Sequence, residues 1–196
     1  SSKAEKNKTY TSEQEKEIFE YLEKNDPLLL LYIKFISFNF LRPVEVNRLL
    51  VKSINLKEKK LSVKTKTNKL KTKIIPDILL QELPDLSQLN QDNYLFTPNG
   101  LGLEWVAEEN NRRDSFSKRF KTVIKDHFNL GSEYGLYSFR HTFITKLYRN
   151  LRENKSPHET KGILMNITGH VTMDALEKYL RDIDAELPED YSNLIR

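Results

Sequence analysis

The sequence predicts a single α+β domain that is mainly α-helical and carries one small antiparallel β-hairpin. Most apolar residues recur every three or four positions, the spacing of helices that bury one face. Residues 61–65 instead alternate between apolar and polar side chains, as a strand does. With 38% hydrophobic and 31% charged residues, a chain of 196 residues holds enough apolar material for one substantial core.

The N-terminal part predicts a polar end followed by two helices. Residues 1–9 are lysine-rich without periodicity, and we interpret them as a flexible end or the remnant of a linker. Ser12 and Glu15 have the spacing of a capping box before the first helix. Asp26 and Pro27 supply an N-cap and a first-turn proline for the second. This second helix is apolar nearly all round and is therefore expected at the centre of the core.

A third helix and the hairpin follow. Pro43 can open a helix directly after Arg42, which places that arginine at a helix start beside the most apolar helix. The alternation at 61–65, the polar stretch 66–70 and the residues 72–75, which end at a proline, together predict a lysine-rich hairpin. We expect it to be the only substantial sheet, with one edge exposed to solvent.

The C-terminal half predicts four further helices. The apolar residues of 115–128 follow helical spacing, and Gly131 stops that pattern. Ser138 is the predicted N-cap of the next helix, Ser156 precedes a first-turn proline, and Thr172 is the predicted cap of a short last helix.

Composition excludes several functional classes. The chain has no cysteine, which rules out disulfides, thiolate metal sites and a cysteine nucleophile. Its longest apolar stretch, residues 28–40, is interrupted by Lys34 and is too short to cross a bilayer, and the N-terminus lacks the apolar core of a signal peptide. The lack of cysteine is compatible with a reducing compartment, so we expect a cytoplasmic protein. Four histidines without clustered carboxylates, and no glycine-rich phosphate loop, favour a protein without metal or cofactor.

The positive charge is unevenly distributed. Residues 57–73 hold eight lysines and one glutamate, a local excess greater than the net charge of +4 of the whole chain. Such a segment can neutralise phosphates and release counterions, which is the sequence-independent part of nucleic-acid affinity. A solvated lysine-rich surface explains the same charge equally well.

Single candidate residues have ordinary explanations. An arginine such as Arg42 with Glu45 three residues later usually forms a structural ion pair. Arg140 is less ordinary, because the dipole disfavours a cation in the first turn of a helix unless an anion lies nearby. His170, between two helices, is by itself expected to pack or cap, and Tyr179 to be half-buried core.

The order of these residues nevertheless resembles the tyrosine recombinase (phage integrase) family over roughly residues 10–180. The matching blocks are Leu41-Arg42-Pro43-Val44-Glu45, Tyr137-Ser138-Phe139-Arg140-His141-Thr142-Phe143, and Thr168-Gly169-His170 followed by Tyr179. The family's hairpin lysine is matched by Lys66, with Lys64 or Lys69 as alternatives if the hairpin register differs. One residue departs from the pattern, because the family's first histidine of the second block is Tyr137 here.

The resemblance implies a site-specific recombinase, integrase or transposase of a mobile element that cleaves and rejoins DNA through a 3′-phosphotyrosine. Arg42 and Arg140 would clamp the phosphate, Lys66 would protonate the departing 5′ oxygen, and His170 would bind the phosphate or move the proton of Tyr179. The implied catalytic set is Arg42, Lys66, Tyr137, Arg140, His170 and Tyr179, with Glu45 in support and Lys64, Lys69, Lys71 and Lys73 binding DNA.

Tyr137 leaves two interpretations open. Its phenol can donate a hydrogen bond to a phosphate oxygen, although a group with an ordinary pKa near 10 is a poor general base. The alternative is packing against Phe139 or Phe143. Two further hypotheses concern the whole chain. It could be a DNA-binding module with impaired catalysis, of which Tyr137 would be the first sign, or a topoisomerase-like or hairpin-forming relative.

The resemblance also implies a domain organisation and partners. Residues 10–182 would form the catalytic domain, with the recombinase catalytic-domain fold. The acidic tail 183–196 would pack on a neighbouring protomer or fold back in cis. We expect double-stranded DNA and a tetrameric synapse as partners, and an upstream DNA-binding domain absent from this chain.

Overall fold

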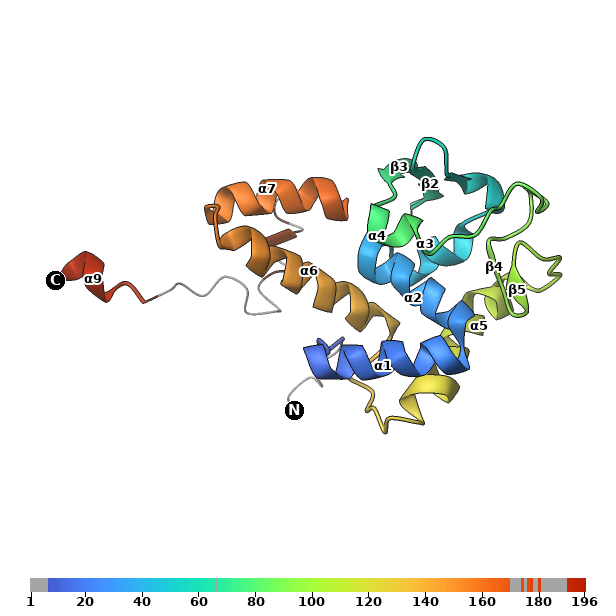
Figure 1. Ribbon diagram of the computed structural model, residues 1–196, viewed down its shortest axis with the longest axis horizontal. Coiled ribbons are helices and arrows are strands. Elements are labelled where there is room, and N and C mark those ends of the chain that lie inside the picture. The colour runs from blue at the N-terminus through green and yellow to red at the C-terminus, as the bar shows by residue number, and fades with distance from the viewer. Residues whose placement is uncertain (1–6, 66, 170–173, 175, 178–179, 181–189) are drawn as a thin grey trace. The chain divides into compact units, whose positions relative to one another are not determined.

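The computed structural model describes residues 7–65, 67–169, 174, 176, 177, 180 and 190–196 (Figure 1). The chain forms two compact units, Ser1–Thr142 and Phe143–Arg196. Within the described part of the chain, no helix is both long enough and apolar enough to cross a membrane.

The first unit is mainly helical, which confirms the predicted fold class. Its helices are α1 (Ser12–Asn25), α2 (Pro27–Asn39), α3 (Pro43–Arg48), α4 (Asp77–Leu80), α5 (Glu109–Phe120), a π-helical turn (Lys121–Lys125), and the start of α6 (Leu136–Arg152).

The predicted start of the first helix is wrong by one residue, whereas that of the second helix is confirmed. The N-cap of α1 is Thr11, whose Oγ1 accepts a hydrogen bond from Gln14 N–H at 3.1 Å, so the predicted Ser12–Glu15 capping box is wrong by one residue. The side chain of Gln14 completes the box, because Thr-x-x-Gln satisfies the same two backbone donors. At α2 the predicted cap is confirmed, since Asp26 Oδ1 accepts from the N–H of Leu29.

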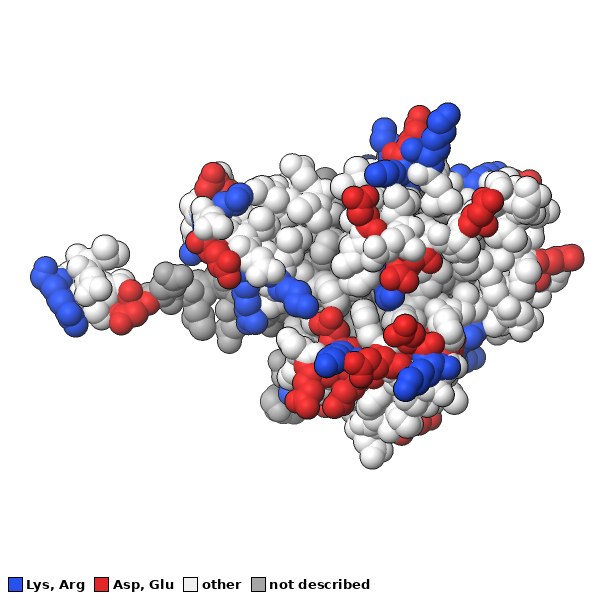
Figure 2. Space-filling view, viewed as in Figure 1, with Lys and Arg blue, Asp and Glu red and all other residues white. Residues whose placement is uncertain are grey.

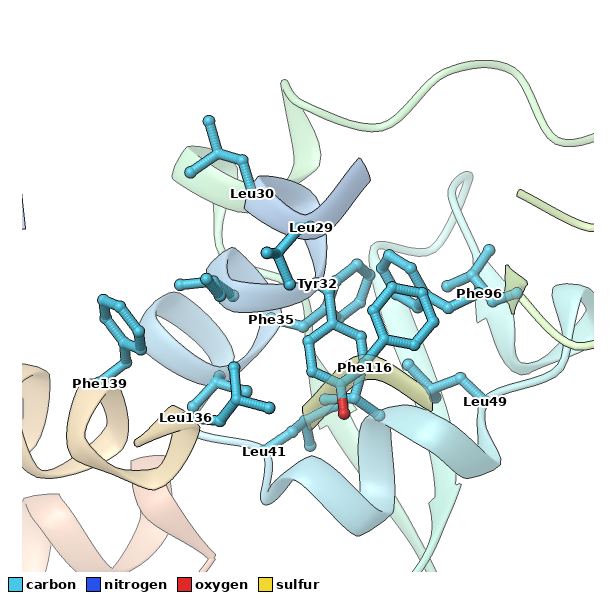
Figure 3. Close-up of a cluster of buried hydrophobic side chains, with 14 of the residues drawn as sticks. Leu29, Leu30, Tyr32, Phe35, Leu41, Leu49, Phe96, Phe116, Leu136 and Phe139 are labelled. Carbon is cyan, nitrogen blue, oxygen red and sulfur yellow. The ribbon is translucent and has the colours of Figure 1, made fainter. Parts of the chain in front are cut away.

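Helix α2 forms the centre of the hydrophobic core. It buries residues on every side, as its nearly continuous apolar sequence requires. The ring of Tyr32 stacks on Phe116 of α5 with centroids 4.4 Å apart, and Phe35 meets Phe96 edge-to-face at 5.5 Å (Figure 3). This packing gives the C-terminal end of α2 a rigid position.

The unit contains two small antiparallel sheets. The first has the order β1-β2-β3, with β1 at Ile54–Asn55, β2 at Lys60–Lys64 and β3 at Leu70–Ile74. The last two strands form the predicted hairpin. The second sheet pairs β4 (Phe96–Thr97) with β5 (Gly100–Leu101), and the sequence pattern did not predict it because each strand has only two residues.

The register of the hairpin determines which lysines face inward. Leu61 lies opposite Lys73 and Val63 lies opposite Lys71. Residues directly opposite in an antiparallel pair project to the same face, and both Leu61 and Val63 are buried. The two lysines therefore point toward the body of the unit, whereas Ile74, the residue after Lys73, is 72% exposed.

Two helix starts in the second half of the unit differ from prediction. Helix α5 begins at Glu109, six residues before Ser115, because its first turns are polar and carry no apolar periodicity. Helix α6 begins at Leu136, so Ser138 is not the N-cap. Its Oγ instead accepts a hydrogen bond at 3.1 Å from the N–H of Gly135, and so caps backward from inside the first turn.

The second unit contains the rest of α6, α7 (Pro157–Thr168) and α9 (Ser192–Ile195). The predicted start of α7 is confirmed, since Ser156 and Glu159 form a capping box. Helix α7 ends at Gly169, whose φ of 76° is a left-handed conformation that glycine adopts without strain. The predicted cap Thr172 lies outside the described residues.

Candidate functional site

The C-terminal end of α2 binds two cations. Phe40 adopts a left-handed conformation with φ 56° and ends the helix, which leaves the last carbonyl groups without helical partners. The carbonyl oxygen of Phe40 accepts a hydrogen bond from Arg140 Nε at 2.8 Å, and that of Asn39 accepts from Lys73 Nζ at 2.6 Å. The negative end of the helix dipole favours both cations.

Asn39 also joins the hairpin through its side chain. Its Nδ2 donates to the carbonyl oxygen of Ile74 at 3.2 Å, beside the bond from Lys73 to its own carbonyl. These two hydrogen bonds hold the end of β3 against the end of α2. No sequence pattern singles out Asn39.

A buried carboxylate organises two further cations. Glu45, in the first turn of α3, is fully buried. Its Oε1 accepts from the backbone N–H of Arg42 at 2.9 Å and lies 3.8 Å from Nη1 of the same residue. Its Oε2 pairs with Lys71 Nζ at 3.0 Å. Burial acts to raise the pKa of Glu45, but the Arg42 N–H and the charges of Lys71 and Arg42 outweigh it, so the pKa is lowered and the carboxylate stays ionised.

Arg140 is fully buried at the start of α6. Its Nη1 donates to the phenol oxygen of Tyr137 at 3.2 Å, while Nε is held by Phe40. Two different partners thus fix the plane of the guanidinium. The ring centroid of Tyr137 lies 5.3 Å from that of His141.

We call Arg42, Lys71, Lys73 and Arg140, together with Glu45, the cation cluster. Among the residues that the structure describes, it combines four basic side chains with one carboxylate. Burial, together with the positive charges of Lys71, Arg140 and Arg42, lowers the pKa of Lys73 to about 7, although the charge of Glu45 acts to raise it. The excess of positive charge favours the binding of an anion there.

Lys64 and Lys69 lie apart from the cluster and are exposed. They belong to a lysine-rich end of the hairpin, where basic side chains gather over β2 and β3 (Figure 2). Three predicted catalytic residues, Lys66, His170 and Tyr179, lie outside the described residues.

The sequence pattern did not predict that the side chains of Lys71 and Lys73 face inward. Both were expected to bind DNA together with Lys64 and Lys69. One signal was present, because alternation places both on the same strand face as Ile75, an apolar residue that proves to be buried. Metal binding has no comparable arrangement, since the described residues include no group of three or more His, Asp or Glu side chains suited to an ion.

The comparison with protein families identifies the chain. A model of the phage integrase family matches residues 8–185, a range that contains the cation cluster as well as His170 and Tyr179. The chain belongs to the phage integrase family. A search of curated proteins found none that matches this chain.

Solved structures of phage integrase relatives share the fold. The XerA recombinase is 15% identical with a TM-score of 0.62 and covers 96% of this chain and 65% of its own. The Tn1549 transposon integrase in complex with a circular intermediate DNA is 15% identical with a TM-score of 0.64, covering 90% of this chain and 62% of its own. The catalytic domain of bacteriophage HP1 integrase is 16% identical with a TM-score of 0.58, covering 89% of this chain and 88% of its own.

The fold of this phage integrase family member is therefore that of a tyrosine recombinase catalytic domain. The chain spans between half and two thirds of the length of the XerA, XerH and Tn1549 proteins that it resembles.

Proposed function

We propose that this chain is the catalytic domain of a cytoplasmic site-specific recombinase of a mobile element, which breaks and rejoins DNA through a 3′-phosphotyrosine at Tyr179. The observation that carries the proposal is the convergence of Arg42 and Arg140 in one cation cluster with a single carboxylate. A phosphodiester under attack gains negative charge on its non-bridging oxygens, and preorganised guanidinium groups stabilise that charge.

The contacts of Arg140 support preorganisation. A guanidinium whose Nε and Nη1 are already bound to Phe40 and Tyr137 does not reorient when the phosphate arrives. Arg42 is held less completely and its side chain is 31% exposed, so it can meet an incoming phosphate. In this arrangement Arg140 is the fixed ligand and Arg42 the accessible one.

The reaction proceeds by exchange of one ester for another. The phenol oxygen of Tyr179 forms a bond to phosphorus, and the bond from phosphorus to the 5′ oxygen breaks. Lys66 gives a proton to that departing oxygen, and His170 takes the proton of the phenol. The roles of these three residues rest on the family resemblance. Attack by a 5′ hydroxyl from another strand reverses the steps and reseals the DNA without ATP, because the ester bond is conserved.

Tyr137 has a supporting role in this proposal. Its oxygen accepts a hydrogen bond from Arg140, so its own proton remains available to a phosphate oxygen. This residue stands where the family has histidine, and that substitution favours the second candidate function, a DNA-binding module with impaired catalysis.

The solved relatives support DNA as the partner. XerH is described as bound to its difH substrate, and the Tn1549 integrase as bound to a circular intermediate DNA. The charge distribution agrees with a DNA partner, because the exposed lysines of the hairpin can contact backbone phosphates. We further propose that the protein assembles into a tetrameric synapse on DNA and that the tail 183–196 couples its subunits. An upstream domain would bind the same DNA.

A covalent-adduct assay tests the function. The protein is incubated with a pool of nicked duplexes of random central sequence, which trap the cleaved state, and adducts are detected on a denaturing gel. We expect an adduct with the parent chain, none with Tyr179→Phe, and a strong reduction with Arg42→Ala. Tyr21→Phe is the matched control, because Tyr21 lies in α1 and its ring stacks on His127, and neither residue has a proposed role.

The assay separates the candidates. An adduct that survives Tyr179→Phe contradicts the assigned nucleophile. Salt-sensitive binding without an adduct identifies the DNA-binding module instead. Relaxation of supercoiled plasmid without strand exchange would favour a topoisomerase-like enzyme.

A further inference from the structure

Lys73 differs from the other lysines of the hairpin. Lys64 and Lys69 are exposed, whereas Lys73 lies opposite the buried Leu61 and turns into the unit. Its Nζ donates to the carbonyl oxygen of Asn39 at 2.6 Å. The side chain is thus positioned inside the cation cluster rather than on the surface that surrounds it.

The groups around Lys73 disfavour its charge. Lys71 approaches from the same strand, Arg42 from α3 and Arg140 from α6, and all three carry positive charge. Among the described residues the opposing group is Glu45, which already pairs through its two oxygens with Lys71 and Arg42. A fourth cation at this position is unfavourable in the free protein, and an anion bound in the cluster would remove the penalty.

We propose that Lys73 is a further ligand of the scissile phosphate and that it takes up one proton from solvent when the phosphate binds. The inference rests on the proposed function, because it assumes that the cluster binds the phosphate. The Asn39 carbonyl supports both states, since either a neutral amine or an ammonium can donate to it. An ammonium keeps two further N–H groups for the phosphate oxygens.

The direction of the pH effect follows from the surroundings. In the free protein burial, with the charges of Lys71, Arg140 and Arg42, lowers the pKa of Lys73 to about 7. A bound phosphate adds negative charge and raises that pKa. The complex therefore holds a proton that the free protein has partly lost above pH 7. DNA affinity is expected to be greatest below that pH and to fall by up to about tenfold per pH unit above it.

The test measures DNA binding and proton uptake in a Tyr179→Phe background, which prevents covalent capture. The probe is a short mixed-sequence duplex, titrated by calorimetry at several pH values in buffers of different ionisation enthalpy. The compared variants are Lys73→Arg, which keeps the charge but does not titrate, Lys73→Met, and the exposed matched control Lys69→Met.

The expected results separate the three variants. Lys73→Arg should bind without the proton uptake and with a flatter pH profile than the background. Lys73→Met should bind about tenfold more weakly than the background below pH 7, because a charged hydrogen bond is lost, and should approach it at high pH. Lys69→Met should bind somewhat more weakly at every pH, because an exposed contact to a phosphate is lost, but should keep the full pH dependence.

Equal proton uptake by the background and Lys73→Arg would overturn the proposal, as would equal pH profiles of Lys73→Met and Lys69→Met. This failure is distinct from failure of the proposed function. The adduct at Tyr179 can form while Lys73 takes up no proton, and in that case only the role of Lys73 is lost. A melting curve of Lys73→Arg verifies that the variant is folded.

Discussion

Two buried charged groups of the first unit have different compositions. In one, Asp26 accepts two hydrogen bonds from Arg119, from Nε at 2.7 Å and from Nη2 at 2.8 Å. Nη1 of Arg119 is bound to the carbonyl oxygen of Pro98 at 2.8 Å, so one cation meets one carboxylate with its donors engaged. In the cation cluster, four basic side chains share Glu45.

The difference indicates how structural and functional charges can be told apart. A balanced pair joins α5 to the start of α2 and needs nothing further, because each charge is neutralised where it lies. The cluster has a net positive charge in a partly buried place, which lowers stability until an anion arrives. Charge balance, rather than burial, therefore distinguishes the two.

The largest expected effect is on catalysis in the cluster. Arg140→Ala should lower the rate of adduct formation about 1,000-fold, because it removes a preorganised donor to the charge of the transition state. The free energy of unfolding should change by only about 1 kcal/mol. Single-turnover gels and urea denaturation measure the two quantities, with Arg140→Lys as the charge-conserving control. A variant that unfolds while any residual folded protein cleaves normally would make Arg140 structural.

The balanced pair should show the opposite behaviour. Asp26→Ala is expected to lower the free energy of unfolding by about 3 kcal/mol, since it leaves Arg119 without its carboxylate and removes the cap of α2. Urea denaturation measures the loss. Adding Arg119→Met should recover much of it, because the unpaired charge is then gone. If Asp26→Ala costs nothing, the contrast drawn between the two groups is wrong.

Removing a charge from the cluster should stabilise the fold. Lys73→Met is expected to raise the free energy of unfolding by about 2 kcal/mol at pH 6. Because folding lowers the pKa of Lys73 from 10.5 to about 7, the stability deficit is complete below pH 7 and disappears as the pH rises toward 10.5. The gain should shrink over that range. Lys71→Met, which removes a partner of Glu45, should destabilise instead, and a destabilised Lys73→Met would contradict the prediction.

The smallest expected effect concerns Tyr137. Tyr137→Phe should slow adduct formation about tenfold, roughly 1.4 kcal/mol, because the oxygen that accepts from Arg140 is lost. The melting temperature should not change appreciably. Tyr137→His provides the comparison with the residue that the family has there and should cleave at least as fast as the parent. An unchanged rate in Tyr137→Phe would favour packing as the role of this side chain.

Local sequence signals predicted much of the fold. Asp26 with Pro27, Pro43, and Ser156 mark helix starts because capping and first-turn proline depend only on neighbouring residues. The same reasoning failed at Ser138. Helix α6 begins at Leu136, and the Ser138 hydroxyl accepts a hydrogen bond from the N–H of Gly135 instead of capping the helix. Two-residue strands leave no periodicity to detect, which explains why β4 and β5 were missed.

The sequence by itself determined the family, through the order of its arginine, Gly-His and tyrosine blocks, and the helical class, through apolar spacing. Only the tertiary structure decided the composition of the cation cluster. Lys73 reaches Asn39 across 34 residues and Arg140 reaches Phe40 across 100. Contacts over such separations depend on how α2, β3 and α6 pack, and no local propensity specifies which carbonyl a distant cation will meet.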